Sequence, residues 1–260
     1  MENPRLHGNG PYTLAVIHGG PGAAGDMAPV ARELSSRRGI LEPLQTELTV
    51  EGQVRELHDL LQAHAGLPVT LLGHSWGAWL SFMFASLHPG MVKKLILVGS
   101  GPFEESYTAS LRETRLNRLD AAERRIVESL VRTMNDPRAP GRLEAMKKLG
   151  ELFTRADSFE MIMPDETRAD IQPDIFMSVM DEAALLRKNG SLLAMGKMIT
   201  CPVVAVHGTR DPHPYEGVAE PLTRVLSDFR LILLDRCGHY PWKERYARDE
   251  FYSIMDREAE

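Results

Sequence analysis

The sequence predicts an α/β fold in which a mostly parallel sheet is flanked by helices. Two observations carry this prediction. Short β-type runs alternate with helical segments over residues 12–98, and the alternation resumes at residue 201. Between them, from about residue 103 to residue 198, no β-type run occurs. Alternation favours parallel strands joined by right-handed crossovers, whereas the long helical stretch indicates a cap inserted into the sheet domain.

The expected domain boundaries follow from this break in rhythm. Residues 1–102 and 199–260 form the predicted α/β core, and residues 103–198 form the predicted helical cap. At 260 residues the chain is long enough to bury the core of one large domain. Open α/β sheets place their sites at the carboxyl ends of the strands, so we expect the cap to cover that edge.

The first part of the core is expected to contain four strands and three helices. Thr49 is suited to cap the second helix, and the third is apolar nearly all round, as expected of a helix packed on the sheet. The expected strands span 12–17, 39–45, 69–73 and 92–98, and two of the helices span about 26–37 and 76–87. The helix between them follows Thr49 and has Val54, Leu57 and Leu61 at helical spacing.

The cap and the last part of the core continue the pattern. Asp120 opens a cap helix whose apolar residues share one face. Strands are expected again at 201–206 and 229–234, followed by a closing helix at about 243–257. The prolines that divide the cap into short helices are Pro137, Pro140, Pro164 and Pro173.

The strand expected at 69–73 ends in a G-x-S-x-G pattern. A buried strand, this pattern and then an apolar helix form the context of a nucleophile elbow, a tight turn that exposes a serine hydroxyl above the sheet. Gly73 and Gly77 suit a turn too tight for flanking side chains. We therefore predict that Ser75, in Gly73-His74-Ser75-Trp76-Gly77, is the catalytic nucleophile.

A glycine-rich loop follows the strand expected at 12–17. In this context such a loop supplies one backbone N–H to an oxyanion, and the residue after the nucleophile supplies the other. The predicted donors are the amides of Gly20 and Trp76. By itself the loop is equally compatible with a simple turn into a helix. The other loop residues that support the motif are His18, Gly19, Pro21 and Gly22.

The predicted acid and base follow the last two strands. Asp211 follows the strand at 201–206 and His239 follows the strand at 229–234, which gives the chain order serine, acid, histidine. A serine hydroxyl needs a base to become a good nucleophile, an imidazole titrates near neutrality, and a carboxylate fixes the useful tautomer. Taken singly, each residue is also compatible with a solvated loop.

Two competing residues lie close to this pair in the sequence. Asp235 is only four residues from His239, too near to reach it easily from the end of the neighbouring strand. His213 follows Asp211 by two residues and is harder to place opposite Ser75. We therefore expect Asp211 and His239 to complete the triad.

At these motifs the chain resembles the α/β-hydrolase superfamily. The pairing of H-G-G-P-G with G-x-S-W-G, and the tail His239-Tyr240-Pro241-Trp242, look most like the proline iminopeptidase branch. The resemblance covers most of residues 12–101 and 200–255. It implies an α/β-hydrolase fold and removal of N-terminal residues from peptides without metal or cofactor. Residues 39–46 stand where that branch carries Asp-Gln-Arg-Gly.

The resemblance leaves several functions open. The branch holds the free amine of its substrate with cap carboxylates, so an aminopeptidase should aim one or two of them inward. The alternatives are a carboxylesterase, lactonase or C–C bond hydrolase, and a hydrolase-fold protein that binds a small ligand without catalysis. The acidic candidates in the cap are Glu104, Glu105, Glu160, Asp165, Glu166, Asp174, Asp181 and Glu182.

The composition of the chain limits the kinds of binding partner that we expect. The formal net charge is −6 and no basic run occurs, so nucleic acid is not an expected partner. The nine histidines show no metal-ligand spacing, and neither a metal nor a cofactor is expected. Cys201 and Cys237 form no disulfide framework, and no signal peptide or membrane span is visible. We expect a cytoplasmic enzyme acting on a small molecule or short peptide.

Overall fold

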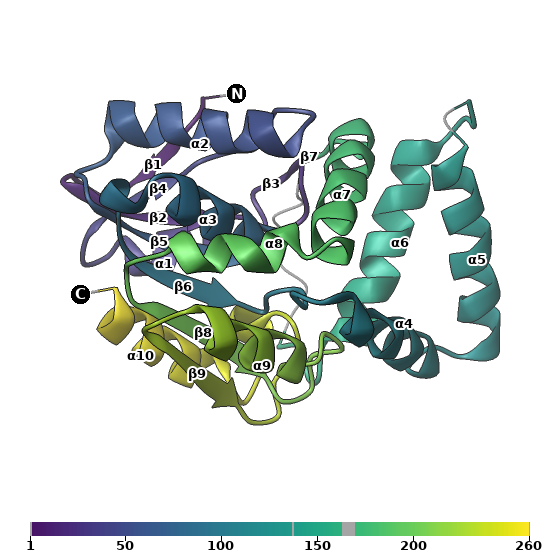
Figure 1. Cartoon of the computed structure of the whole chain (residues 1–260). Coiled ribbons are helices and arrows are strands. Elements are labelled where there is room, and N and C mark those ends of the chain that lie inside the picture. The colour runs from purple at the N-terminus through teal and green to yellow at the C-terminus, as the bar shows by residue number, and fades with distance from the viewer. Residues whose placement is uncertain (1, 137, 163–169, 260) are drawn as a thin grey trace.

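The computed structural model describes residues 2–136, 138–162 and 170–259, and their main sheet has seven strands in the order β1-β4-β2-β5-β6-β8-β9. Helices cover both faces of this sheet, and the α5–α6 pair stands out to one side (Figure 1). The mostly parallel α/β fold expected from the sequence is confirmed. The strands are β1 (Arg5–His7), β2 (Tyr12–Ile17), β4 (Gly39–Glu42), β5 (Val69–His74), β6 (Val92–Val98), β8 (Val203–Gly208) and β9 (Phe229–Leu234).

Strand β1 is the antiparallel member of this sheet and was not expected. It pairs with β4, whereas the other neighbouring strands pair in parallel. Three residues are too few to show a two-residue period, and Leu6 at its centre is exposed. An ion pair from Arg5 and a hydrogen bond from His7 to the buried Glu42 tie this edge strand to the sheet.

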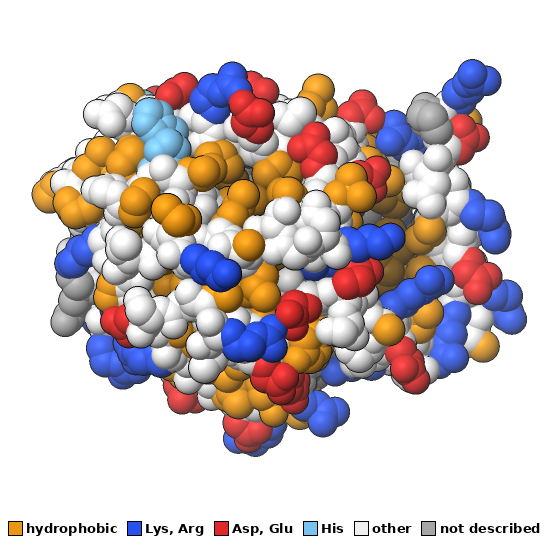
Figure 2. All heavy atoms as spheres, viewed as in Figure 1, with side chains coloured by type: hydrophobic (Ala, Val, Ile, Leu, Met, Phe, Trp, Pro, Cys, Tyr) orange, Lys and Arg blue, Asp and Glu red, His pale blue; other side chains and the backbone are white. Residues whose placement is uncertain are grey.

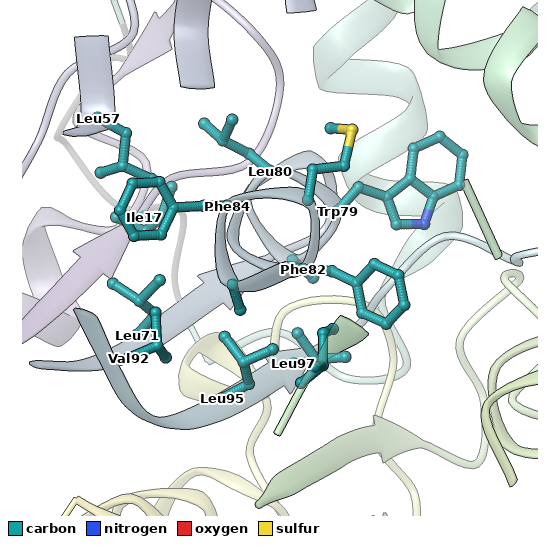
Figure 3. Packing of buried hydrophobic residues seen from close by; sticks show 14 of the residues in the cluster. Ile17, Leu57, Leu71, Trp79, Leu80, Phe82, Phe84, Val92, Leu95 and Leu97 are labelled. Carbon is teal, nitrogen blue, oxygen red and sulfur yellow. The ribbon is translucent and has the colours of Figure 1, made fainter. Parts of the chain in front are cut away.

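Two apolar layers sandwich the sheet. One packs α1 (Ala28–Leu34) and α10 (Arg248–Glu258) against the sheet, and the other packs α2 (Val50–His64), α3 (Trp76–Leu87) and α9 (Glu216–Val225) against the opposite face. Helix α3 is buried along nearly its whole length, and its apolar side chains belong to one cluster with Leu71, Leu95 and Leu97 of β5 and β6 (Figure 3). This packing fixes the start of α3, where the predicted nucleophile lies.

The cap consists of helices with a small core of their own. They are α4 (Thr108–Asn117), α5 (Ala121–Asn135), α6 (Arg142–Asp157), α7 (Pro173–Lys188) and α8 (Ser191–Ala194). Asp120 and Glu123 form a capping box at the start of α5, as the sequence predicted. Short 3₁₀ helices occur at Pro89–Met91, Glu105–Tyr107, Met195–Met198 and Pro241–Lys243.

A second, two-stranded sheet joins the cap to the core. Strand β3 (Ala23–Ala24) lies in the loop after β2, and β7 (Asp170–Ile171) precedes α7 in the segment where no β-type run was expected. Strands of two residues are too short to show the alternation of apolar and polar residues from which a strand is predicted. None of the helices in the described part of the chain is long and apolar enough to cross a bilayer.

Candidate active site

Ser75 lies at a strained turn between β5 and α3. Its backbone has a φ of 52° and a ψ of −116°, in a region that non-glycine residues rarely adopt. Its N–H donates to the carbonyl of Val98 at 2.9 Å. A Cβ on Gly73 would lie 2.2 Å from the carbonyl oxygen of Gly77, and one on Gly77 would lie 2.3 Å from that of Ile17. The turn therefore requires both glycines.

The glycine-rich loop packs directly on this turn. A Cβ on Gly19 would lie 2.7 Å from Nδ1 of His74 and 3.1 Å from Cβ of Ser75. Gly20 has a φ of +57° and lines one pocket together with Ser75 and Trp76. Trp76 is the first residue of α3, so its N–H has no partner within the helix. The two predicted oxyanion donors thus lie on two segments, the glycine-rich loop and the start of α3, that line one pocket with the serine.

The remaining residues of the glycine-rich loop hold this loop in place. His18 is fully buried, and its Nε2 accepts from the N–H of Gln45 while its carbonyl accepts from the Gln45 side chain. Burial lowers the pKa of His18, which favours the neutral ring. Gly22 has a φ of +70° and accepts from the N–H of Gln172, just before α7. Pro21 lies between these anchors.

Asp211 and His239 come together at the carboxyl ends of β8 and β9. Nδ1 of His239 lies 2.8 Å from Oδ2 of Asp211, and both side chains are almost fully buried. His239 lines the same pocket as Ser75. The competing Asp235 is 84% exposed and pairs with Arg236 instead. The geometry therefore brings together the residues predicted as acid and base.

Three histidines surround the Asp211 carboxylate. His213 approaches Oδ1 at 2.9 Å and His207 approaches Oδ2 at 3.3 Å, in addition to His239. Burial alone would raise the pKa of Asp211, but the three imidazoles, His239 foremost, hold that pKa well below its usual range. His213 was expected to be hard to place opposite Ser75, yet it also lines the pocket.

The histidine cluster is a poor metal centre. The possible ligand atoms of Asp211, His213 and His239 all lie within 4.8 Å of one another. However, the rings of His213 and His239 stack at 4.3 Å with only 21° between their planes. Their in-plane lone pairs therefore run side by side, whereas metal ligands must converge. Hydrogen bonds to the carboxylate account for this donor set.

A pocket of about 440 Å³ lies between core and cap above Ser75. Its lining is mainly apolar, and Figure 2 shows hydrophobic side chains recessed between the cap helices and the rest of the molecule. The core and the cap both contribute to this lining. The apolar and sulfur-containing residues include Trp76, Trp79, Leu111, Met134, Met146, Leu149, Phe153, Ile171, Phe176 and Met180.

Among the residues that the structure describes, two carboxylates line this pocket, and neither was among the candidates. Asp157, at the end of α6, is 1% exposed and forms a bidentate pair with Arg115, whose Nε is 2.7 Å from Oδ1. Asp26 lies 3.4 Å from Nζ of Lys243 and 3.5 Å from Nδ1 of His74. Burial opposes ionisation of Asp26, but Lys243 and His74 hold its pKa below the usual range.

The acidic residues that the sequence singled out do not line the pocket where they are described. Glu104, Glu105, Glu160 and Asp174 pair with arginines, while Glu182 accepts from the N–H of Val50 at the start of α2. Asp181 is exposed. Asp165 and Glu166 lie outside the described residues. A carboxylate in the cap can be recognised as inward-facing only from the packing of its helix.

Comparisons with known proteins agree with this architecture. A pimeloyl-[acyl-carrier protein] methyl ester esterase of Chromobacterium violaceum is 26% identical over 71% of this chain and 68% of its own length. A probable proline iminopeptidase of Streptomyces coelicolor is 25% identical over 86% of this chain and 81% of its own.

Solved structures share the fold. That of VinJ has a TM-score of 0.68 at 18% identity, covering 98% of this chain and 93% of its own. A proline iminopeptidase of Mycobacterium smegmatis has a TM-score of 0.65 at 16% identity, over 98% and 92%. The family model described as "Alpha/beta hydrolase family" matches residues 8–252. The probable proline iminopeptidase of Streptomyces coelicolor supports the resemblance to that branch. The protein is a hydrolase that belongs to the alpha/beta hydrolase family.

Proposed function

We propose that the protein is a serine hydrolase that cleaves esters of apolar carboxylic acids through an acyl-enzyme. The observation that carries this proposal is the pocket beside Ser75, whose lining is mainly apolar and comes from both core and cap. An apolar acyl group gains free energy by leaving water for such a pocket. The described cap acids that the sequence singled out lie outside it, and the cap acid that does line it, Asp157, is already paired with Arg115.

The chemistry assigns a role to each residue. His239 takes the proton of the Ser75 hydroxyl as its oxygen attacks the acyl carbon, and then gives that proton to the departing alcohol. Asp211 keeps the proton on Nδ1 of His239 and stabilises the imidazolium. The backbone N–H groups of Gly20 and Trp76 stabilise the tetrahedral oxyanion. Water, activated by His239, then releases the acid and restores the serine.

A second candidate function, an aminopeptidase, is favoured by Asp26. Its carboxylate lines the pocket with Ser75, is one-fifth exposed, and has a lowered pKa, so it is anionic at neutral pH. An α-ammonium group bound next to the nucleophile would find a charge partner there. The existing pair with Lys243 competes with that role, which is why the ester function ranks first.

The test begins with the nucleophile. A fluorophosphonate should label the wild-type protein once, and Ser75→Ala should lose both labelling and turnover while remaining folded. Loss of a triad member removes several orders of magnitude in rate. Retention of more than about a tenth of the wild-type rate in Ser75→Ala would refute the serine mechanism.

A substrate panel then separates the two functions. Para-nitrophenyl esters of increasing acyl length should be cleaved, with kcat/KM rising from acetate to a medium-length acyl chain. Aminoacyl naphthylamides should be poor substrates. Cleavage of the amides in preference to the esters, with a selective loss of amide activity in Asp26→Asn, would instead establish the aminopeptidase. Asp235→Asn, an exposed aspartate, is the matched control.

A further inference from the structure

We propose that His213 is a positioning residue that holds the Asp211 carboxylate so that Oδ2 remains aimed at His239. The proposal rests on the proposed function, because it takes Asp211 and His239 as acid and base. His213 itself forms no bond to the reacting atoms in this scheme. It acts through the carboxylate and through the face of the catalytic imidazole.

The first argument is the division of labour between the two oxygens of Asp211. Oδ1 accepts from the backbone N–H of His213 at 2.9 Å and faces Nδ1 of the same residue at 2.9 Å. Oδ2 faces Nδ1 of His239 at 2.8 Å, and Nε2 of His207 lies farther from it, at 3.3 Å. A carboxylate held only through Oδ2 can still rotate about its Cβ–Cγ bond. Two donors on Oδ1 prevent this rotation and fix the direction of Oδ2.

The second argument concerns tautomers. An ionised carboxylate only accepts hydrogen bonds, so each Nδ1 that faces Asp211 must carry a proton. The pKa of Asp211 is held well below its usual range, which keeps it ionised near neutrality. In the neutral ring of His239 the proton then sits on Nδ1 and Nε2 is free, as a base that receives the serine proton requires.

The third argument is that His213 is itself anchored. Nε2 of the buried His207 lies 2.9 Å from the carbonyl oxygen of His213 and donates to it, since a carbonyl only accepts. Burial lowers the pKa of His207, so that ring is neutral and needs no counter-ion. The backbone that supplies one of the two donors to Oδ1 is thereby fixed to β8.

The fourth argument is the stacking of the two rings. The planes of His213 and His239 lie 21° apart with 4.3 Å between ring centroids, and both rings line the pocket with Ser75. His213 therefore covers one face of the catalytic imidazole and limits its rotation. Misplacement of a catalytic group by about 1 Å can cost on the order of a hundredfold in rate.

Three substitutions separate these contributions. His213→Asn keeps an N–H donor near the position of Nδ1, His213→Phe keeps the ring face without a donor, and His213→Ala removes both. We expect kcat on an ester to fall about tenfold to a hundredfold in His213→Phe and further in His213→Ala, with KM within about twofold. His213→Asn should recover to within about threefold of the wild type. His64→Asn and His64→Phe, at an exposed position in α2, are the matched controls.

The rate constant for fluorophosphonate labelling gives a readout that does not depend on substrate binding, and it should follow the same order. Urea unfolding identifies any variant that is not folded, and the comparison of His213→Asn with His213→Phe then rests on the folded ones. If His213→Phe equals the wild type, or if His213→Asn is as slow as His213→Phe, the positioning role is wrong. A loss in all three variants as large as that of Ser75→Ala would make His213 the base and also overturn it.

The same experiment distinguishes a failure of this proposal from a failure of the serine hydrolase function on which it rests. If the wild type is neither labelled nor active on any acyl substrate, the serine mechanism fails and the role of His213 fails with it. If the wild type is labelled at Ser75 and His213→Phe is unchanged, only the positioning role fails.

Discussion

At the scale of single residues, the strained backbone of Ser75 is held in place by its surroundings. The two glycines that flank it, Gly73 and Gly77, have no room for a side chain. Positive φ costs a non-glycine residue on the order of 1–3 kcal/mol. The bond from Ser75 N–H to Val98 and the burial of α3 hold the turn in place. Gly77 allows α3 to start against the carbonyls of Ile17 and His18. This close approach of α3 to β2 brings the glycine-rich loop next to Ser75.

Gly77→Ala should therefore be destabilising. Its Cβ would lie 2.3 Å and 2.6 Å from the backbone oxygens of Ile17 and His18, and backbone at the end of a central strand cannot move aside. We expect the free energy of unfolding, measured in urea, to fall by about 1–3 kcal/mol or more. Gly150→Ala, at an exposed site in α6 with no atom within 4 Å of the new Cβ, should gain roughly 0.5–1 kcal/mol. Equal effects of the two substitutions would contradict this account.

At the scale of elements, one buried carboxylate joins the cap to the loop of His239, the proposed base. Glu244 is fully buried and accepts from the N–H groups of Phe159 and Glu160, both at 2.7 Å, and of Gly238 at 3.0 Å. The N–H of His239 donates to the carbonyl of Asp157 at 2.8 Å, at the end of α6. The position of His239 therefore depends on the segment that follows α6.

Glu244→Ala should loosen this junction. It leaves the buried N–H of Gly238 without its acceptor, at a cost of about 1–3 kcal/mol, and it releases the N–H groups of the exposed Phe159 and Glu160 to water. We expect a loss of about 1–3 kcal/mol in the free energy of unfolding, together with faster proteolysis at residues 158–162. Glu244→Gln, which keeps one acceptor oxygen, should fall between Ala and the wild type. Glu151→Ala, exposed on α6, should change neither measurement. Unchanged proteolysis in Glu244→Ala would show that the tie is dispensable.

The elements also show which helices and strands can be predicted from sequence patterns alone. Strands β2, β6 and β9 and helix α3 have the predicted bounds, because each is long enough to show its period or its uniform burial. The motif glycines could be predicted because close approaches permit no other residue. Strands β1 and β7 have two or three residues and no period.

The parts of the site that sequence reasoning missed depend on packing between distant segments. Asp157 faces the pocket because α6 ends beside the loop of His239, which the helical pattern of α6 does not reveal. The sequence pointed to His213 only as a competing residue. Its contact with Asp211 could have been inferred from the short spacing, since a carboxylate two residues earlier can accept from its backbone and its ring.

At the scale of the whole molecule, the interior holds several neutral histidines. His18, His74 and His207 are at most 1% exposed, and burial, the largest cause in each case, lowers their pKa from 6.5. His74 uses its buried ring to donate from Nε2 to the carbonyl of His239 at 3.0 Å. These rings support both glycine-rich turns and the acid loop, so the protonation state of the interior is linked to the integrity of the site.

This linkage predicts how stability depends on pH. An unfolded histidine takes up a proton as the pH falls through about 6.5, whereas the three buried rings resist protonation, so the unfolded state binds more protons and stability falls as the pH is lowered. Asp211, whose pKa is depressed, acts in the same direction at lower pH, since its contribution is present above the unfolded value of 3.8 and is lost as the pH falls below it.

Free energies of unfolding in urea should therefore reach a plateau above about pH 7 and decline between about pH 6.5 and 5, by up to about 1.4 kcal/mol per pH unit for each proton taken up. This decline precedes the titration of most carboxylates. His207→Gln keeps a donor near the position of Nε2 but cannot be protonated, so it should reduce the slope in this range. His64→Gln, which replaces an exposed ring, should leave the slope unchanged. A flat profile from pH 8 to 5 in the wild type would show that the buried rings accept protons in the folded state.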